Sequence, residues 1–170
     1  MMPFLVAAAL DSGVVSDEDS FFCEEGLWRY GGRLIHDYHP HGDLLVPEII
    51  KYSSNICSAK IGVKLGAERL HDYLERFGFG SRSGVRLPGE VSGQLAAAAS
   101  WRPVRLANIS FGQGMGSTAL LLAVGYATPA NGGVRMKPRL VKTVVAADGT
   151  VKVPDETVVE GRAVSKQVAA

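Results

Sequence analysis

The segment Tyr52-Ser53-Ser54-Asn55 places a hydroxyl and a carboxamide two residues apart, at a junction between two helical patterns. If both side chains face one cleft, the Ser53 hydroxyl can relay a proton and the Asn55 amide can hold a substrate peptide group. The same residue types also cap helix N-termini, and on spacing alone capping is the simpler interpretation. Both interpretations stay open at this point.

A glycine-rich loop is the second candidate for chemistry. We interpret 107–111 as a strand that leads into Gly112-Gln113-Gly114-Met115-Gly116 and then into a helix. Backbone N–H groups at such a junction can bind phosphate. However, a serine occupies the place of the third glycine of a dinucleotide motif, the next acidic residue is Asp148, and a P-loop lysine is missing. We therefore expect glycines that let the backbone pass close to a neighbouring helix.

Histidines and cysteines are the remaining candidates. His36, Asp37, His39 and His41 fall within six residues, but Pro40 interrupts them and no other ligand lies at a recognisable spacing. We predict a loop held by local hydrogen bonds, without a metal or a cofactor.

The two cysteines, Cys23 and Cys57, show no metal-ligand or Cys-x-x-Cys spacing. A disulfide between them requires a geometry that the sequence does not supply, so we expect two unpaired thiols.

Helices and one hairpin must position these residues. Helical patterns cover 3–10, 47–52, a segment capped by Ser54 or Asn55, 70–77 with Gly78 as its stop, and a segment from 117 or 118 to 127. Residues 16–33 are expected to form a loop or a short hairpin. Two β-branched runs, 139–145 and 151–153, are joined through Asp148-Gly149, which predicts a hairpin. A further helix is expected to begin within 163–170.

Composition narrows the class of protein. The chain has 170 residues, 46% hydrophobic and 21% charged, with a net charge of +1, which is typical of a globular domain and gives no overall basic field for nucleic acid. The apolar run Pro3–Leu10 is far shorter than the roughly 18 residues that cross a bilayer, and it lacks the basic start of a signal peptide. We therefore expect no membrane anchor or export signal within these residues.

A series of short motifs, taken in order, resembles the transpeptidase domain of class B penicillin-binding proteins, the septal and elongation D,D-transpeptidases. The motifs are Pro3-Phe4, Ala7-Ala8-Ala9-Leu10, Gly13-Val14-Val15, Cys23-Glu24, His39-Pro40-His41-Gly42, Tyr52-Ser53-Ser54-Asn55, 74–80, Leu87-Pro88-Gly89-Glu90, Ile109-Ser110-Phe111-Gly112-Gln113-Gly114 and Ala130-Asn131-Gly132-Gly133. Each motif alone is weak, whereas their order over nearly the whole chain is specific.

The resemblance implies an α/β (α+β) fold of the serine D,D-transpeptidase and β-lactamase type. Residues 1–170 would be one partial transpeptidase domain, truncated at both ends, with the helix-rich middle part, one C-terminal hairpin and an incomplete central antiparallel sheet. It also implies a proton relay at Ser53, a substrate amide ligand at Asn55, and structural support near the cleft from Gly112, Gln113 and Gly114.

Only the middle one of the family's three motifs is present. No Ser-x-x-Lys occurs, and Met2 stands where the lysine would precede Pro3-Phe4. No Lys-Thr-Gly occurs either, and Lys142-Thr143-Val144 is the nearest run. We therefore expect this chain by itself to be inactive, because without the nucleophilic serine no acyl-enzyme forms.

The intact parent would cross-link peptidoglycan stem peptides, react with β-lactams, need no cofactor and bind no nucleic acid. Cell-division or elongation proteins would be its partners, and it would sit in the inner membrane with this domain in the periplasm or otherwise outside the cytoplasm. A non-catalytic scaffold for cell-wall synthesis partners is the alternative hypothesis.

Overall fold

The computed structural model describes residues 1–85, 87–153 and 156–170. The helices are α1 (Met2–Asp11), α2 (Val46–Tyr52), α3 (Asn55–Leu65), α4 (Ala67–Arg76), α5 (Pro103–Ser110) and α6 (Ala119–Ala130), with short 3-10 turns η1 (Glu24–Gly26) and η2 (Ala98–Ser100). The strands are β1 (Ser20–Phe22), β2 (Leu27–Tyr30), β3 (Arg33–His36), β4 (Asp43–Leu45), β5 (Val134–Met136), β6 (Val144–Val145), β7 (Val151–Val153) and β8 (Val159–Arg162).

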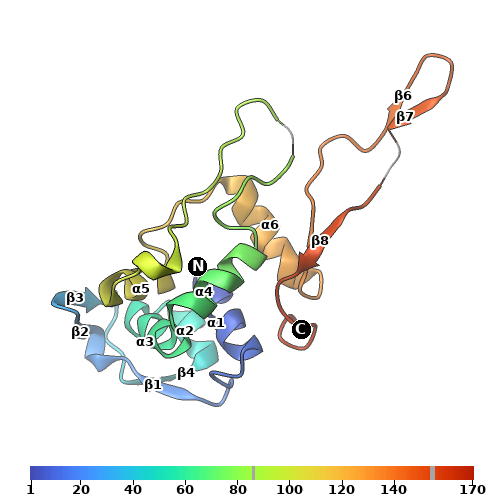
Figure 1. Ribbon diagram of the computed structural model, residues 1–170. Helices are drawn as coiled ribbons and strands as arrows, with labels where there is room; N and C mark the ends of the chain where they lie inside the picture. Colours follow the sequence, from blue (N-terminus) through green and yellow to red (C-terminus); the bar gives the residue numbers. More distant parts are fainter. Residues whose placement is uncertain (86, 154–155) are drawn as a thin grey trace.

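Helix α1 is the centre of the helical body (Figure 1). Its only charged residue is Asp11, at its last position, and Pro3 occupies its first turn, so the helix is apolar on all sides and suited to burial. Phe4, Leu5, Ala8 and Ala9 are at most 1% exposed. Helices α2, α3 and α4 all contact α1, and α5 packs against α3.

Within the described residues, the strands form four two-stranded antiparallel pairs, β1–β4, β2–β3, β5–β8 and β6–β7. The mixed helical and antiparallel architecture expected from the resemblance is confirmed. The hairpin at Asp148-Gly149 is also confirmed, with the Gly149 N–H donating to the Ala146 carbonyl, and it projects away from the helical body (Figure 1). Its first strand is shorter than predicted, because only Val144 and Val145 pair with β7.

Two expectations about secondary structure are wrong, and one strand pair was missed. The segment 107–111 is not a strand: α5 runs from Pro103, which favours a helix start, to Ser110. Residues 163–170 form turns in which the Ala169 N–H donates to the Ser165 carbonyl, and no α-helix is formed there. The β5–β8 pair was not foreseen, since three- and four-residue strands carry little alternation to detect.

Candidate functional site

Ser53 lies in a tight turn between α2 and α3. It ends α2 with φ 57° and ψ 44°, a left-handed conformation that is uncommon for a residue with a side chain. The Ser53 N–H donates to the Ile50 carbonyl at 3.2 Å, which holds this conformation in place. The Ser53 hydroxyl is directed across the turn and donates to the Met2 sulfur at 3.4 Å. The turn therefore brings an exposed serine against the first turn of the buried helix α1.

Helix capping at this junction is performed by Ser54. Its hydroxyl oxygen accepts from the Cys57 N–H at 3.0 Å, in the normal geometry of an N-cap. Asn55 is the first residue of α3, and its amide nitrogen donates to the His36 carbonyl at 3.1 Å. The capping interpretation is therefore confirmed for Ser54 alone, and the cap uses neither the Ser53 nor the Asn55 side chain.

Asp37 anchors this turn, a role that the sequence did not indicate. One carboxylate oxygen accepts from the Ser54 hydroxyl at 2.6 Å, and the other accepts from the Ile56 N–H at 3.0 Å. Since Asp37 directly follows β3, these bonds tie the β2–β3 hairpin to the start of α3. No spacing rule links an aspartate to a turn 17 residues later, so only the tertiary structure reveals the pairing.

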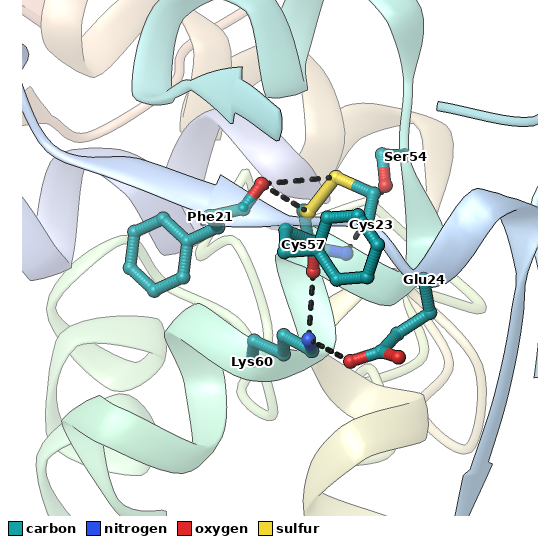
Figure 2. A network of polar contacts seen from close by, with 7 residues as sticks. Phe21, Cys23, Glu24, Ser54, Cys57 and Lys60 are labelled. Carbon is teal, nitrogen blue, oxygen red and sulfur yellow. Dashed lines mark hydrogen bonds and ion pairs between the residues drawn. A yellow bond between two sulfur atoms is a disulfide. The ribbon is translucent and has the colours of Figure 1, made fainter. Parts of the chain in front are cut away.

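Cys23 and Cys57 form a disulfide, which corrects the expectation of two free thiols. Their Cα atoms are 5.2 Å apart, within the range that a disulfide spans, and both residues are fully buried. The pairing of β1 with β4 and the contacts of β1 with α3 bring the two cysteines together. The Phe21 carbonyl oxygen lies 3.5 and 3.3 Å from the two sulfurs (Figure 2); these are close contacts, because a disulfide has no proton to donate.

A lysine on α3 adds a second link between the same two segments. The Lys60 ammonium donates to the Phe22 carbonyl at 2.6 Å and forms an ion pair with Glu24 at 2.5 Å (Figure 2). It also lies 5.4 Å from the centre of the Trp28 ring, a cation–π distance. The start of α3, which carries Asn55, is thus fastened to 20–28 by covalent, ionic and hydrogen bonds.

The glycine-rich loop passes close to the start of α1. Gly112 has φ +102°, and a Cβ atom there would lie 3.0 Å from the Met1 Cβ. Two backbone hydrogen bonds between Gln94 and Gly116, at 2.8 and 2.9 Å, hold the far end of the loop. The structure therefore brings Ser53 and Gly112 to the same end of α1, and Gly112 has the close-approach role expected of the glycines in this loop.

The histidine segment is arranged differently from a metal centre. The His41 ring lies 4.9 Å from the Tyr52 ring, and His39 lies 4.6 Å from Tyr38. In the described part of the chain, no group of three or more His, Cys, Asp or Glu side chains is placed to hold a metal ion. Within the same residues, no helix is long and apolar enough to span a bilayer.

A buried central helix, a Ser-x-Asn turn beside it and small antiparallel strand pairs together form a mixed α/β domain. The family model "Penicillin binding protein transpeptidase domain" matches residues 2–170, so the chain belongs to the penicillin-binding protein transpeptidase family. The resemblance seen in the sequence is confirmed.

Curated relatives agree with this assignment and are class B proteins. The chain is 36% identical over 147 residues to penicillin-binding protein PbpB of Mycolicibacterium smegmatis, covering 85% of this chain and 22% of the relative. It is 32% identical over 147 residues to the probable peptidoglycan D,D-transpeptidase PenA of Neisseria meningitidis, covering 86% of this chain and 25% of the relative. The chain thus spans a quarter or less of the length of these relatives.

Solved structures show the same fold. The D,D-transpeptidase domain of a peptidoglycan glycosyltransferase from Eggerthella lenta superposes with a TM-score of 0.92 at 26% identity, covering 99% of this chain and 44% of that one. Penicillin-binding protein 3 of Mycobacterium tuberculosis, solved with aztreonam, gives a TM-score of 0.88 at 32% identity, covering 99% of this chain and 38% of that one.

Proposed function

We propose that this chain is an internal part of a peptidoglycan D,D-transpeptidase that cross-links stem peptides by serine acyl transfer, with Ser53 as its proton relay and Asn55 as its substrate amide ligand. The observation that carries the proposal is the 3.4 Å contact between the Ser53 hydroxyl and the Met2 sulfur. In the family, the lysine that activates the nucleophile would stand at the position of Met2. A lysine there would reach the Ser53 hydroxyl in the same way, which is the contact that a proton relay needs.

Residues 1–170 lack groups that the acyl-transfer reaction requires. A thioether takes up no proton at neutral pH, so Met2 cannot serve as the base that ionises a nucleophile. The chain contains neither Ser-x-x-Lys nor Lys-Thr-Gly, and groups that act as a unit lose most of their rate acceleration when one member is missing. The isolated chain is therefore inactive in this proposal, and β-lactams and stem peptides are ligands of the intact domain.

The buried disulfide supports a location outside the cytoplasm. Disulfides persist in the periplasm and at cell surfaces, whereas the cytosol keeps thiols reduced. Gly112, Gln113 and Gly114 support the start of the central helix in this proposal, and proteins of cell division or elongation are the partners of the parent.

Labelling with a fluorescent penicillin, followed by denaturing electrophoresis, tests the proposal. The chain of 18.1 kDa should show no labelled band, even after overnight incubation. The intact parent should be labelled, and a Ser53→Ala substitution in the parent should slow acylation by about 10²-fold or more, the usual contribution of a positioned proton-transfer group. Labelling of the isolated chain, or an unchanged acylation rate in the parent variant, would refute the assigned roles.

A further inference from the structure

A polar groove opens directly beside Asn55, between the β2–β3 hairpin and α5. Its volume is about 420 Å³. The hairpin tip packs closely against α5: a Cβ atom at Gly31 would collide with the Val104 side chain. The groove is lined by residues from three separate segments of the chain: Arg33, Leu34, Ile35, His36, Asn55, Val104, Asn108, Phe111 and Gln113.

Several polar side chains in this groove have no hydrogen-bond or ion-pair partner in the described part of the chain. Across residues 1–85, 87–153 and 156–170, the side chains of Arg33, His36, Asn108 and Gln113 form no hydrogen bond or ion pair. Asn55 donates to the His36 carbonyl, which leaves its amide oxygen available to accept. One guanidinium and three carboxamides, drawn from three segments, therefore line a single groove.

Arginines outnumber acidic residues around the groove, where Asp37, which directly follows His36 and binds Ser54 and the Ile56 N–H, adds one negative charge. The segments 27–36 and 101–118, which form its two sides, contain Arg29, Arg33, Arg102 and Arg105 and no aspartate or glutamate. Among the described residues none of these four arginines forms an ion pair. Because the chain as a whole carries a net charge of only +1, this is a local concentration of positive charge, and it attracts anions.

The remaining lining restricts the kind of anion. Leu34, Val104 and Phe111 supply apolar walls, and carboxamides pair with peptide N–H and C=O groups. An arginine fork recognises a carboxylate through two parallel hydrogen bonds. The combination fits a short extended peptide that carries a free carboxylate and small apolar side chains.

From these features we propose that the groove is a peptide subsite that takes the carboxylate-bearing segment of a peptidoglycan stem peptide, with Arg33 binding the carboxylate. The proposal rests on the proposed function and extends it, because it places a peptide segment on the hairpin side of Asn55. In this arrangement Asn55 joins the subsite to the Ser53 turn, and Asn108 and Gln113 hold peptide groups along the opposite wall.

The test measures binding of the tripeptide L-Ala-γ-D-Glu-L-Lys to the 170-residue chain by titration calorimetry, at 25 and 200 mM salt. The free peptide should bind saturably and more weakly at the higher salt, because the contact is ionic. The same peptide with both carboxylates amidated should bind at least about fivefold more weakly, as expected for the loss of a charge-assisted contact.

Two variants with the same change of charge separate a specific site from general attraction. Arg33→Gln should weaken binding at least about fivefold, whereas Arg69→Gln, an exposed arginine on α4, should leave it unchanged. Near-ultraviolet circular dichroism checks that each variant keeps the wild-type fold. Equal binding by Arg33→Gln and wild type, or no saturable binding by the folded wild type, would overturn the proposal. Failure of the proposed function is read separately, by penicillin labelling of the parent and its Ser53→Ala variant, in which Arg33 is unchanged.

Discussion

Removal of the Cys23–Cys57 disulfide should destabilise the chain by about 4 kcal/mol. The bond closes a loop with a sequence separation of 34, which contains β2, β3, β4, α2 and the whole Ser53 turn. The loop-closure relation gives an entropy of about −12.6 cal/mol/K for this length, or about 3.8 kcal/mol at 25 °C. That is a large share of the roughly 5–15 kcal/mol by which domains are stable.

Urea unfolding followed by circular dichroism measures this loss. Cys23→Ala, Cys57→Ala and the double variant are compared with the oxidised wild type, and thiol titration of the unfolded wild type should find no free thiol. Each single variant should already show most of this loss of about 4 kcal/mol, because either substitution opens the loop. The double variant should lose little more. Losses below about 1 kcal/mol, or two titratable thiols in the wild type, would refute the reasoning.

The site should respond to the same perturbation. Because Cys57 lies two residues after Asn55 and donates to the Ser54 cap, opening the loop should loosen the start of α3 first. Amide hydrogen exchange of Cys57 should accelerate more than that of Leu74, in the middle of the buried core. Equal acceleration at the two positions would mean that the disulfide acts on global stability alone.

Three further substitutions test other contacts. Asp37→Ala should cost about 2–4 kcal/mol in urea unfolding, since it removes two hydrogen bonds to a carboxylate, and a cost under about 0.5 kcal/mol would contradict the anchoring role. Burial would raise the pKa of Asp11, but hydrogen bonds from Ser165 and Tyr73 lower it overall. The wild type should therefore be more stable than Asp11→Asn above about pH 4, and this advantage should be lost as the pH falls through the lowered pKa. An advantage that does not change with pH would contradict this reasoning. Burial, followed by the hydrogen bond to Asp11, raises the pKa of Tyr73 to about 12. Ultraviolet titration of Asp11→Asn should therefore give a lower pKa for Tyr73, and an unchanged pKa would rule out the bond. Gly62→Ala should destabilise strongly, because its Cβ would overlap the Ser110 side chain, and adding Ser110→Gly should restore much of the loss; no rescue would mean that the clash is not the cause.

The elements with strong local signals were predictable from the sequence. Helix α4 follows the apolar spacing of Leu70, Tyr73 and Leu74 and ends before Gly78, and the hairpin follows from Asp148-Gly149. Such patterns depend on neighbours within a few residues, which is where periodicity and turn chemistry operate. The family was also recognisable, because the order of its short motifs is written in the sequence.

Contacts between distant segments were decided by the tertiary structure alone. The disulfide, the Asp37 anchor and the Ser53–Met2 contact join residues 34, 17 to 19 and 51 positions apart. At such separations the sequence shows that these residues are present but not which of them lie close together. Their distances depend on how α1, α3 and the β1–β4 pair pack. The sequence thus determined which groups were available for chemistry, and packing around the buried helix α1 determined which of them meet.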